Sequence, residues 1–191
     1  GKNINFVRNL IYKFNDPVKG EVYQPFDVLP EATASIPEKV IIFSDDKSKQ
    51  IPVTIKAGKD NLEGTVFLQY PKGWNVTPNS QTFSISKKGD GSTLLFTVTP
   101  PSEQSEGKLK PIVKVGDKNY QKELFTIDYG YIPLQQVLME AEAKLVHISI
   151  QKKGENIGYI KGAGDAIPES LEQIGYNVTS INPSEITSEE L

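Results

Sequence analysis

The sequence lacks cysteine altogether and has one histidine, one tryptophan and one methionine among its 191 residues. Without cysteine there can be no disulfide, no thiolate nucleophile and no Cys-ligated metal. The single histidine, His147, has neither a cluster of further metal ligands nor a nucleophile elbow to accompany it. We therefore interpret His147 as a structural residue of a strand. We expect no catalytic residue, no metal ligand and no cofactor-binding residue in this chain.

Long apolar runs and a strong charge of one sign are also missing. No run approaches the roughly 18 apolar residues that a membrane-spanning helix needs. The net charge of -3 creates no basic surface for nucleic acid or anionic lipid. We expect neither a membrane span nor a nucleic-acid partner. The chain starts Gly1-Lys2-Asn3 without Met or an apolar signal region, so we interpret it as a piece of a longer protein.

Short segments of alternating apolar and polar residues, separated by turns, dominate the first two thirds of the sequence. Many of the 13 prolines and 15 glycines lie between these segments. Alternation with a period of two is typical of strands that bury one face. Seven or more such strands predict a mainly β protein with a Greek-key, immunoglobulin-like β-sandwich. The residues expected to face inward include Ile51, Val53, Ile55, Ala57, Phe83, Ile85, Leu94, Phe96 and Val98.

Three regions follow from this pattern. Residues 1–30 are predicted to be an N-terminal linker or edge strand, because the stretch from Gly20 onward is punctuated by proline. Residues 31–152 are predicted to form the sandwich, with residues 109–115 and 120–127 as a hairpin. The stretch from Leu134 to Ala143 could form a short helix or an extended crossover.

Residues 153–191 follow a different pattern. A strand at 156–160, a helix at 167–174 with Pro168 in its first turn, and a strand at 176–181 predict a truncated βαβ segment, the start of an α/β domain. The glycine-rich turn at 162–165 has the setting of a phosphate-binding turn. However, Ile167 stands where G-x-G-x-x-G needs its last glycine, and Lys161 is not followed by Ser or Thr. We favour a tight turn over a nucleotide site.

Two other residue types could bind ligands. Carboxylates in turns could hold calcium, but none has the spacing of a calcium loop, and Asp favours turns for backbone reasons, so we interpret them as solvated. They are Asp45, Asp46, Asp60, Asp90 and Asp117. Aromatic side chains could form a sugar-stacking platform or an interface. The candidates are Trp74, Tyr70, Tyr120, Tyr129 and Tyr131, although Trp74 after a Pro-Lys-Gly turn is more typical of a core residue at a sandwich end.

Several strings resemble known proteins. PKGWNVTP at 71–78 and FTVTPP at 96–101 are similar to NPCBM-associated sandwich domains. YIP at 131–133, NIGYIKGAGD at 156–165 and PESLEQIGYNVT at 168–179 resemble the C-terminal part of Bacteroidetes PIG-L (LmbE-like) deacetylases. The resemblance implies a zinc-dependent de-N-acetylase domain elsewhere in the parent protein, an amidotransferase-like start at 153–191, and a periplasmic or extracellular location. The His-Pro-Asp-Asp signature of the catalytic domain is absent, so no catalytic residue transfers to this chain.

Two functions are compatible with these features. The first is a non-catalytic accessory module that contacts the catalytic deacetylase domain of the same chain. The alternative is a carbohydrate-binding module that targets the parent enzyme to glycan. Self-association, through exposed edge strands or through the unfinished α/β segment, is a further expectation.

Overall fold

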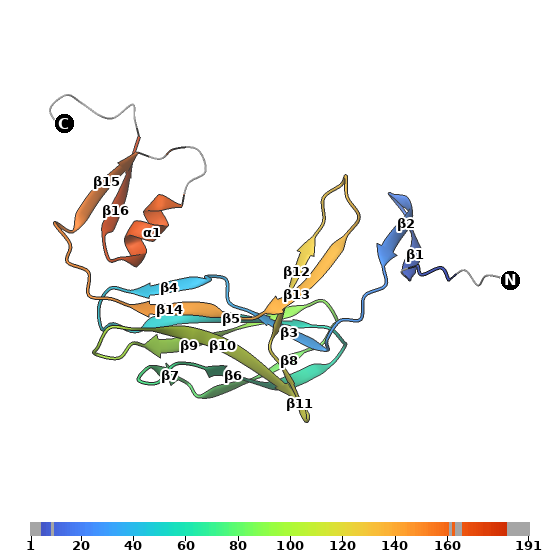
Figure 1. Cartoon of the computed structure of the whole chain (residues 1–191), viewed down its shortest axis with the longest axis horizontal. Helices are drawn as coiled ribbons and strands as arrows, with labels where there is room; N and C mark the ends of the chain where they lie inside the picture. Colours follow the sequence, from blue (N-terminus) through green and yellow to red (C-terminus); the bar gives the residue numbers. More distant parts are fainter. Residues whose placement is uncertain (1–4, 9, 161, 163–165, 183–191) are drawn as a thin grey trace.

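A computed structural model describes residues 5–8, 10–160, 162 and 166–182, and it shows a mainly β protein with two packed sheets (Figure 1). The first sheet has the order β4 (Val40–Phe43), β14 (Ala143–His147), β10 (Ser105–Val115), β6 (Leu62–Gln69) and β8 (Ser80–Ile85). A short strand, β11 (Lys118–Tyr120), also pairs with β10. The second sheet has the order β3 (Ala32–Ser35), β5 (Lys49–Ala57), β9 (Gly91–Thr99) and β7 (Asn75–Thr77).

The core lies between the inner faces of these two sheets. As predicted, Ile51, Val53 and Ile55 of β5 are buried, and the residues between them point outward. In β9 the same alternation buries Phe96 and Val98, which are both 0% exposed. The first sheet contributes the facing layer, which includes Phe43, Leu62, Val66, Phe83, Ile85, Leu109, Val113 and Leu145.

The strand order is consistent with an immunoglobulin-like sandwich. The chain crosses from β6 in the first sheet to β7 in the second and returns to the first sheet as β8. Neighbouring strands within each sheet are antiparallel except for β4 and β14, which pair in parallel with Lys144 opposite Val40. The first strand of the sandwich is divided between the sheets: β3 lies at the edge of the second sheet, and β4 lies at the edge of the first sheet. The last strand, β14, lies between β4 and β10.

A two-stranded hairpin interrupts that last strand. Val113 of β10 faces Tyr120 of β11, so an uninterrupted strand would bring Leu124 opposite Leu109. Leu109 instead faces Ala143. The chain between them leaves the sheet as β12 (Lys122–Ile127) and returns as β13 (Gln135–Glu140), and we call this hairpin the arm. The predicted hairpin of 109–115 with 120–127 is therefore wrong beyond Tyr120, and the stretch 134–143 contains a strand rather than a helix.

The N-terminal region also differs from its prediction as a linker or an edge strand. It forms an antiparallel hairpin of β1 (Ile11–Asp16) and β2 (Gly20–Pro25), which we call the N-terminal hairpin. The Asp16 carboxylate accepts hydrogen bonds from the backbone N–H groups of Val18 and Lys19, each at 2.8 Å, and Gly20 takes a φ of 75°. This local turn chemistry reverses the chain, and Pro25 ends the second strand.

Residues 156–181 contain β15 (Asn156–Ile160), α1 (Ile167–Gln173) and β16 (Asn177–Ile181), and the two strands pair in parallel. Figure 1 shows this C-terminal unit next to β4, at the end of the sandwich opposite the N-terminal hairpin. The Lys49 Nζ donates to the carbonyl oxygen of Gln173 at 3.4 Å, at the C-terminal end of α1. Within the glycine-rich turn of 162–165, Ala163, Gly164 and Asp165 lie outside the described residues, so the tight-turn prediction remains a prediction.

Neighbouring residues of β9 provide a matched test of the core. Replacing Phe96 with alanine is expected to lower the free energy of unfolding by about 3–5 kcal/mol, because the ring is fully buried and leaves a cavity. Leu95→Ala, at a side chain that is 52% exposed, should cost less than about 1 kcal/mol. Urea denaturation of both variants measures the difference, and equal losses would contradict the assigned inward and outward faces.

Candidate interaction site

Exposed apolar side chains are concentrated outside the sandwich. Among the described residues of the two packed sheets and their connecting loops, the large exposed apolar side chains are Val40, Tyr70 and Leu95. The residues before β3 expose Phe6, Val7, Leu10, Ile11, Tyr12, Val18, Tyr23, Phe26, Val28 and Leu29. The arm exposes Phe125, Tyr129, Tyr131, Val137, Leu138 and Met139. The arm and the residues before β3, which include the N-terminal hairpin, therefore carry most of the exposed apolar side chains that a partner could bury.

Several contacts hold the base of the arm in place. The Ala141 N–H donates to the Gln121 carbonyl oxygen at 2.9 Å and closes the base. Lys39, which lies just before β4, forms an ion pair with Glu123 of β12. Its ammonium group also lies 5.6 Å from the centre of the Phe125 ring. The arm is thus attached to the sandwich by backbone, charge and aromatic contacts together.

A groove of about 1100 Å³ lies where the arm meets β10 and β14. We call it the arm groove, and its lining residues are Lys39, Glu106, Gly107, Lys108, Glu123, Phe125, Met139, Glu140, Glu142 and Lys144. The lysines among them are paired with carboxylates of the same groove. Lys108 lies 2.7 Å from Glu142, and Lys144 lies 2.8 Å from Glu106. With these charges neutralised in pairs, the apolar groups that a partner could contact are Phe125 and Met139.

The ion pairs lower the pKa values of two carboxyl groups at the base of the arm. The hydrogen bond from Lys108 lowers the pKa of Glu142; burial opposes this shift, and a second bond from Lys110 supports it. The hydrogen bond from Lys122 lowers the pKa of Glu140. Both carboxylates therefore stay ionised to a lower pH than an ordinary glutamate.

The opposite face of the arm borders a second cavity, of about 260 Å³. Leu124, Thr126 and Gln136 of the arm line it together with Leu29 and Pro30, which connect the N-terminal hairpin to β3. Both faces of the arm are therefore partly open. The residues of this surface were not anticipated from the sequence, although the unbroken apolar run Val137-Leu138-Met139 indicates a strand that is apolar on both faces.

Trp74 lies in the core, as the alternative interpretation predicted. Its side chain is 5% exposed, and its Nε1 donates to the Ser105 Oγ at 3.1 Å. The indole packs edge-on against Phe43, with 5.1 Å between ring centres. Trp74 is therefore unavailable as a stacking surface for a ligand, because Phe43 and Ser105 of the first sheet contact it and only 5% of its surface is exposed.

The other predicted aromatics divide between the arm and the sandwich. Tyr129 and Tyr131, at the tip of the arm, are 56% and 84% exposed. Their rings are stacked with centres 5.7 Å apart and planes 16° apart. Tyr70, 38% exposed, follows β6 in the sandwich, and Tyr120 packs against the core. The structure brings only the two arm tyrosines together.

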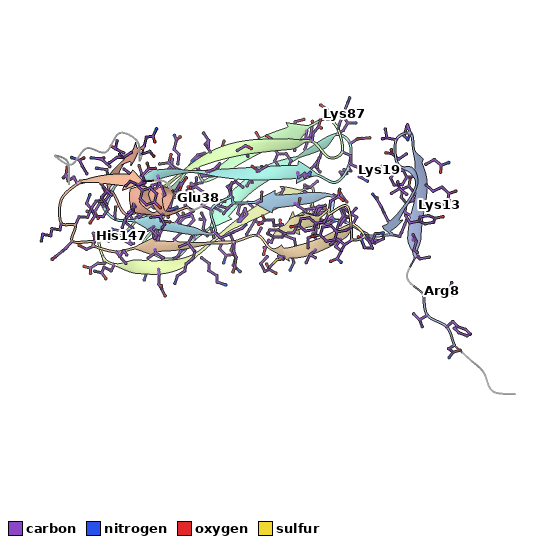
Figure 2. The ribbon with its side chains drawn as sticks, turned by 90° about the horizontal axis from the view of Figure 1, so that it is seen from above. Arg8, Lys13, Lys19, Glu38, Lys87 and His147 are labelled. Carbon is purple, nitrogen blue, oxygen red and sulfur yellow. The ribbon has the colours of Figure 1, made fainter. Side chains whose placement is uncertain are left out.

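His147 is 5% exposed at the end of β14 (Figure 2). Its Nδ1 lies 3.0 Å from the Glu103 carbonyl oxygen, and its Nε2 lies 3.4 Å from an Asp46 carboxylate oxygen. These contacts support the structural role predicted for this residue. Within the part of the chain that the structure describes, no group of three or more His, Cys, Asp or Glu side chains is placed to hold a metal ion.

No protein-family model and no curated protein matches the chain. One similar solved structure is that of WR4, a C. elegans MSP family member, with 12% identity, a TM-score of 0.33, and coverage of 61% of this chain and 98% of that one. Another is the Reelin-N domain of F-spondin, with 12% identity, a TM-score of 0.35, and coverage of 62% and 87%. At these scores the similarities carry no functional argument. No helix in the described residues has the length and apolarity needed to cross a bilayer.

The ion pair between Lys108 and Glu142 has a measurable consequence. Lys108→Met is expected to raise the pKa of Glu142 towards its ordinary value, because it removes the largest cause of the lowered pKa. In the unmodified chain, the stabilisation from this pair is complete above the ordinary glutamate pKa. It is lost as the pH falls through the lowered pKa of the folded state.

NMR titration of the Glu142 carboxyl carbon measures this shift. Lys114→Met is the matched control, since Lys114 lies on the same strand but is not among the causes of the Glu142 shift. An unchanged Glu142 pKa in the Lys108 variant would show that the pair does not form in solution.

Proposed function

We propose that this chain is a non-catalytic accessory module that docks on a neighbouring protein domain through the arm and the N-terminal hairpin. The observation that carries the proposal is the concentration of exposed apolar side chains on the arm and on the residues before β3, which include the N-terminal hairpin. An isolated two-stranded hairpin is at best marginally stable in water, so both hairpins gain stability when a partner covers them. Apolar surface gathered on projecting elements is typical of interaction sites.

The expected identity of the partner domain follows from the resemblance to PIG-L deacetylases. In that interpretation, the partner is the zinc-dependent catalytic domain of the same polypeptide, which removes acetyl groups from N-acetylated sugars outside the cytoplasm. The C-terminal unit would then open an amidotransferase-like α/β domain. The half-exposed Ile160 and Ile167, each 50% exposed, support this, because a parallel strand pair needs cover on both faces.

The arm groove is suited to receive an apolar anchor from the partner. Phe125 and Met139 are 38% and 53% exposed, whereas the charges around them are paired with each other. An apolar side chain can enter such a groove without breaking an ion pair or leaving a buried charge unpaired. The fixed base of the arm lowers the entropy lost on binding.

Substitution in the groove tests the docking role. The double variant Phe125→Asp/Met139→Asp is expected to weaken binding to a zinc-loaded PIG-L de-N-acetylase domain at least about tenfold, which is roughly 1.4 kcal/mol. Isothermal titration calorimetry measures this affinity. Thr82→Asp, an exposed position on β8, is the control and should bind as the unmodified chain does.

Equal affinities of the groove variant and the control would contradict docking at the arm. Release of acetate from an N-acetylglucosaminide by this chain alone, in the presence of zinc, would contradict the non-catalytic role. Both measurements use the same purified chain, so a failure of docking can be separated from an unexpected catalytic activity.

Glycan binding is a second candidate, supported by the stacked and exposed Tyr129 and Tyr131 at the arm tip. Exposed aromatic rings can stack on the apolar face of a sugar ring. If glycan binds there, Tyr131→Ala should weaken binding of N-acetylglucosamine oligomers about tenfold in calorimetry. Tyr70→Ala, on the sandwich, should leave it unchanged. Undetectable binding of these oligomers by the unmodified chain would exclude this candidate for this sugar class.

A further inference from the structure

The outer face of the second sheet is almost free of charge. Because Ile51, Val53 and Ile55 point into the core, the alternate residues of β5 point outward, and the same holds for its neighbours. We call this surface the hydroxyl face. Its residues are Ser35 of β3, Gln50, Pro52, Thr54 and Lys56 of β5, Thr93, Leu95, Thr97 and Thr99 of β9, and Asn75 and Thr77 of β7.

Only Lys56, at one end of the hydroxyl face, carries a charge. This contrasts with a chain in which 24% of the residues are charged. It also contrasts with the outer face of the first sheet, where β10 alone presents Glu106, Lys108, Lys110 and Lys114. Depletion of charged residues is the compositional signature that distinguishes the centre of a protein interface from ordinary surface.

We propose that the hydroxyl face is a self-association surface, on which two copies of the chain pack face to face about a two-fold axis. A two-fold axis places the same patch of both copies in contact, so the patch must be complementary to itself. Thr, Ser, Asn and Gln side chains both donate and accept hydrogen bonds, so a face built of them presents donors and acceptors that its own copy can match. The outer face of the first sheet would instead bring the lysines of β10 together.

The centre of the hydroxyl face has an apolar contact within a polar surround. Leu95 is 52% exposed and lies opposite Pro52 in the register of β5 and β9. On one side of this pair, the Thr54 and Thr93 hydroxyl groups are hydrogen-bonded at 3.0 Å. An apolar centre with a polar rim is the usual anatomy of a specific interface.

Edge-to-edge pairing through the centre of β9 is disfavoured. The Leu95 carbonyl oxygen, beyond the end of β7, accepts a hydrogen bond from the Gln81 side chain at 2.7 Å. This backbone group is therefore already satisfied and does not invite an added strand. Packing of one sheet on the other, about 10 Å apart, remains the way for two copies to bury Leu95.

The size of the face indicates a weak dimer. β5 and β9 are nine residues long, so at about 3.3 Å per residue the face is roughly 30 Å long. The neighbouring strands β3 and β7 are only four and three residues long, so with strands about 4.8 Å apart the face covers roughly 400 Å² per copy. A total of roughly 800 Å² lies below the range of stable specific interfaces and is compatible with a transient dimer. We therefore expect dissociation constants on the order of 100 µM rather than nanomolar.

The centre of the proposed surface lies apart from the cavities beside the arm: Leu95 and Pro52 line neither of them, and only Lys56, at one end of the hydroxyl face, lines the cavity of about 260 Å³. In Figure 2, β5 and β9 (cyan and green) form the layer on one side of the sandwich, and the arm (tan) lies towards the other side. The arm groove and the hydroxyl face share no lining residue, so each can be changed without altering the other. The self-association proposal does not rest on the proposed docking function.

Sedimentation velocity from about 5 to about 500 µM tests the proposal. The unmodified chain is expected to show a weight-average sedimentation coefficient that rises with concentration towards that of a dimer. Leu95→Lys and, independently, Thr93→Lys should keep the chain monomeric, because the axis would bring the new charges together. Thr82→Lys, on the outer face of the first sheet, is the control and should dimerise normally. Thr93 and Leu95 are both exposed, so their lysine variants should melt at the same temperature as the unmodified chain.

Three results would overturn the proposal. One is a chain that stays monomeric up to the highest concentration. Another is a dimer that persists in both the Leu95 and the Thr93 variants. The third is a dimer that survives these changes but dissociates in Met139→Lys, since that would place self-association on the arm. Docking on the deacetylase domain is measured at low concentration with arm variants. A failure of the docking proposal can therefore be distinguished from a failure of the self-association proposal.

Discussion

Packing of two sheets on a single apolar layer is the constraint on which the rest of this structure depends. Each strand of the sandwich places alternate side chains in that layer, and the remaining side chains point outward, where they can contact solvent or a partner. Burial of Phe96, Val53 and Leu145 leaves little apolar surface on the sandwich itself. The hairpins, which do not contribute to the layer, are left with apolar residues that only a partner can cover.

The position of the arm explains how a small sandwich can present such a surface. Because the arm interrupts the last strand between Gln121 and Ala141, its base is fixed by the strands on either side and by the ion pair of Lys39 with Glu123. An insertion there leaves the core intact, since Leu109 still finds an apolar partner in Ala143. The proposed docking groove lies at this junction, where paired charges surround Phe125 and Met139.

The two outer faces divide the polar residues of the sandwich by type. Lysines and glutamates gather on β10 and its neighbours, next to the arm groove, whereas hydroxyl and amide side chains occupy β5 and β9. Such a division is not needed for folding, because either kind of polar residue can face water. It suits two different contacts: an apolar anchor from another domain at the arm, and a copy of the chain at the hydroxyl face.

The sequence by itself determined the mainly β class and the inward residues of β5, β8 and β9, because strand alternation is a local property. It favoured a core position for Trp74 but kept this residue among the candidate ligand-binding aromatics. It failed where local signals were ambiguous. The Asp16 turn that makes the N-terminal hairpin lies close to a proline-containing stretch that indicated a linker. The pairing of Leu109 with Ala143 instead of Leu124 depends on contacts between distant strands. Only the tertiary structure decided that the arm forms a groove with Lys108 of β10 and Lys144 of β14. It also decided that Leu95 lies opposite Pro52 on a face almost free of charge, because both contacts join strands far apart in the chain.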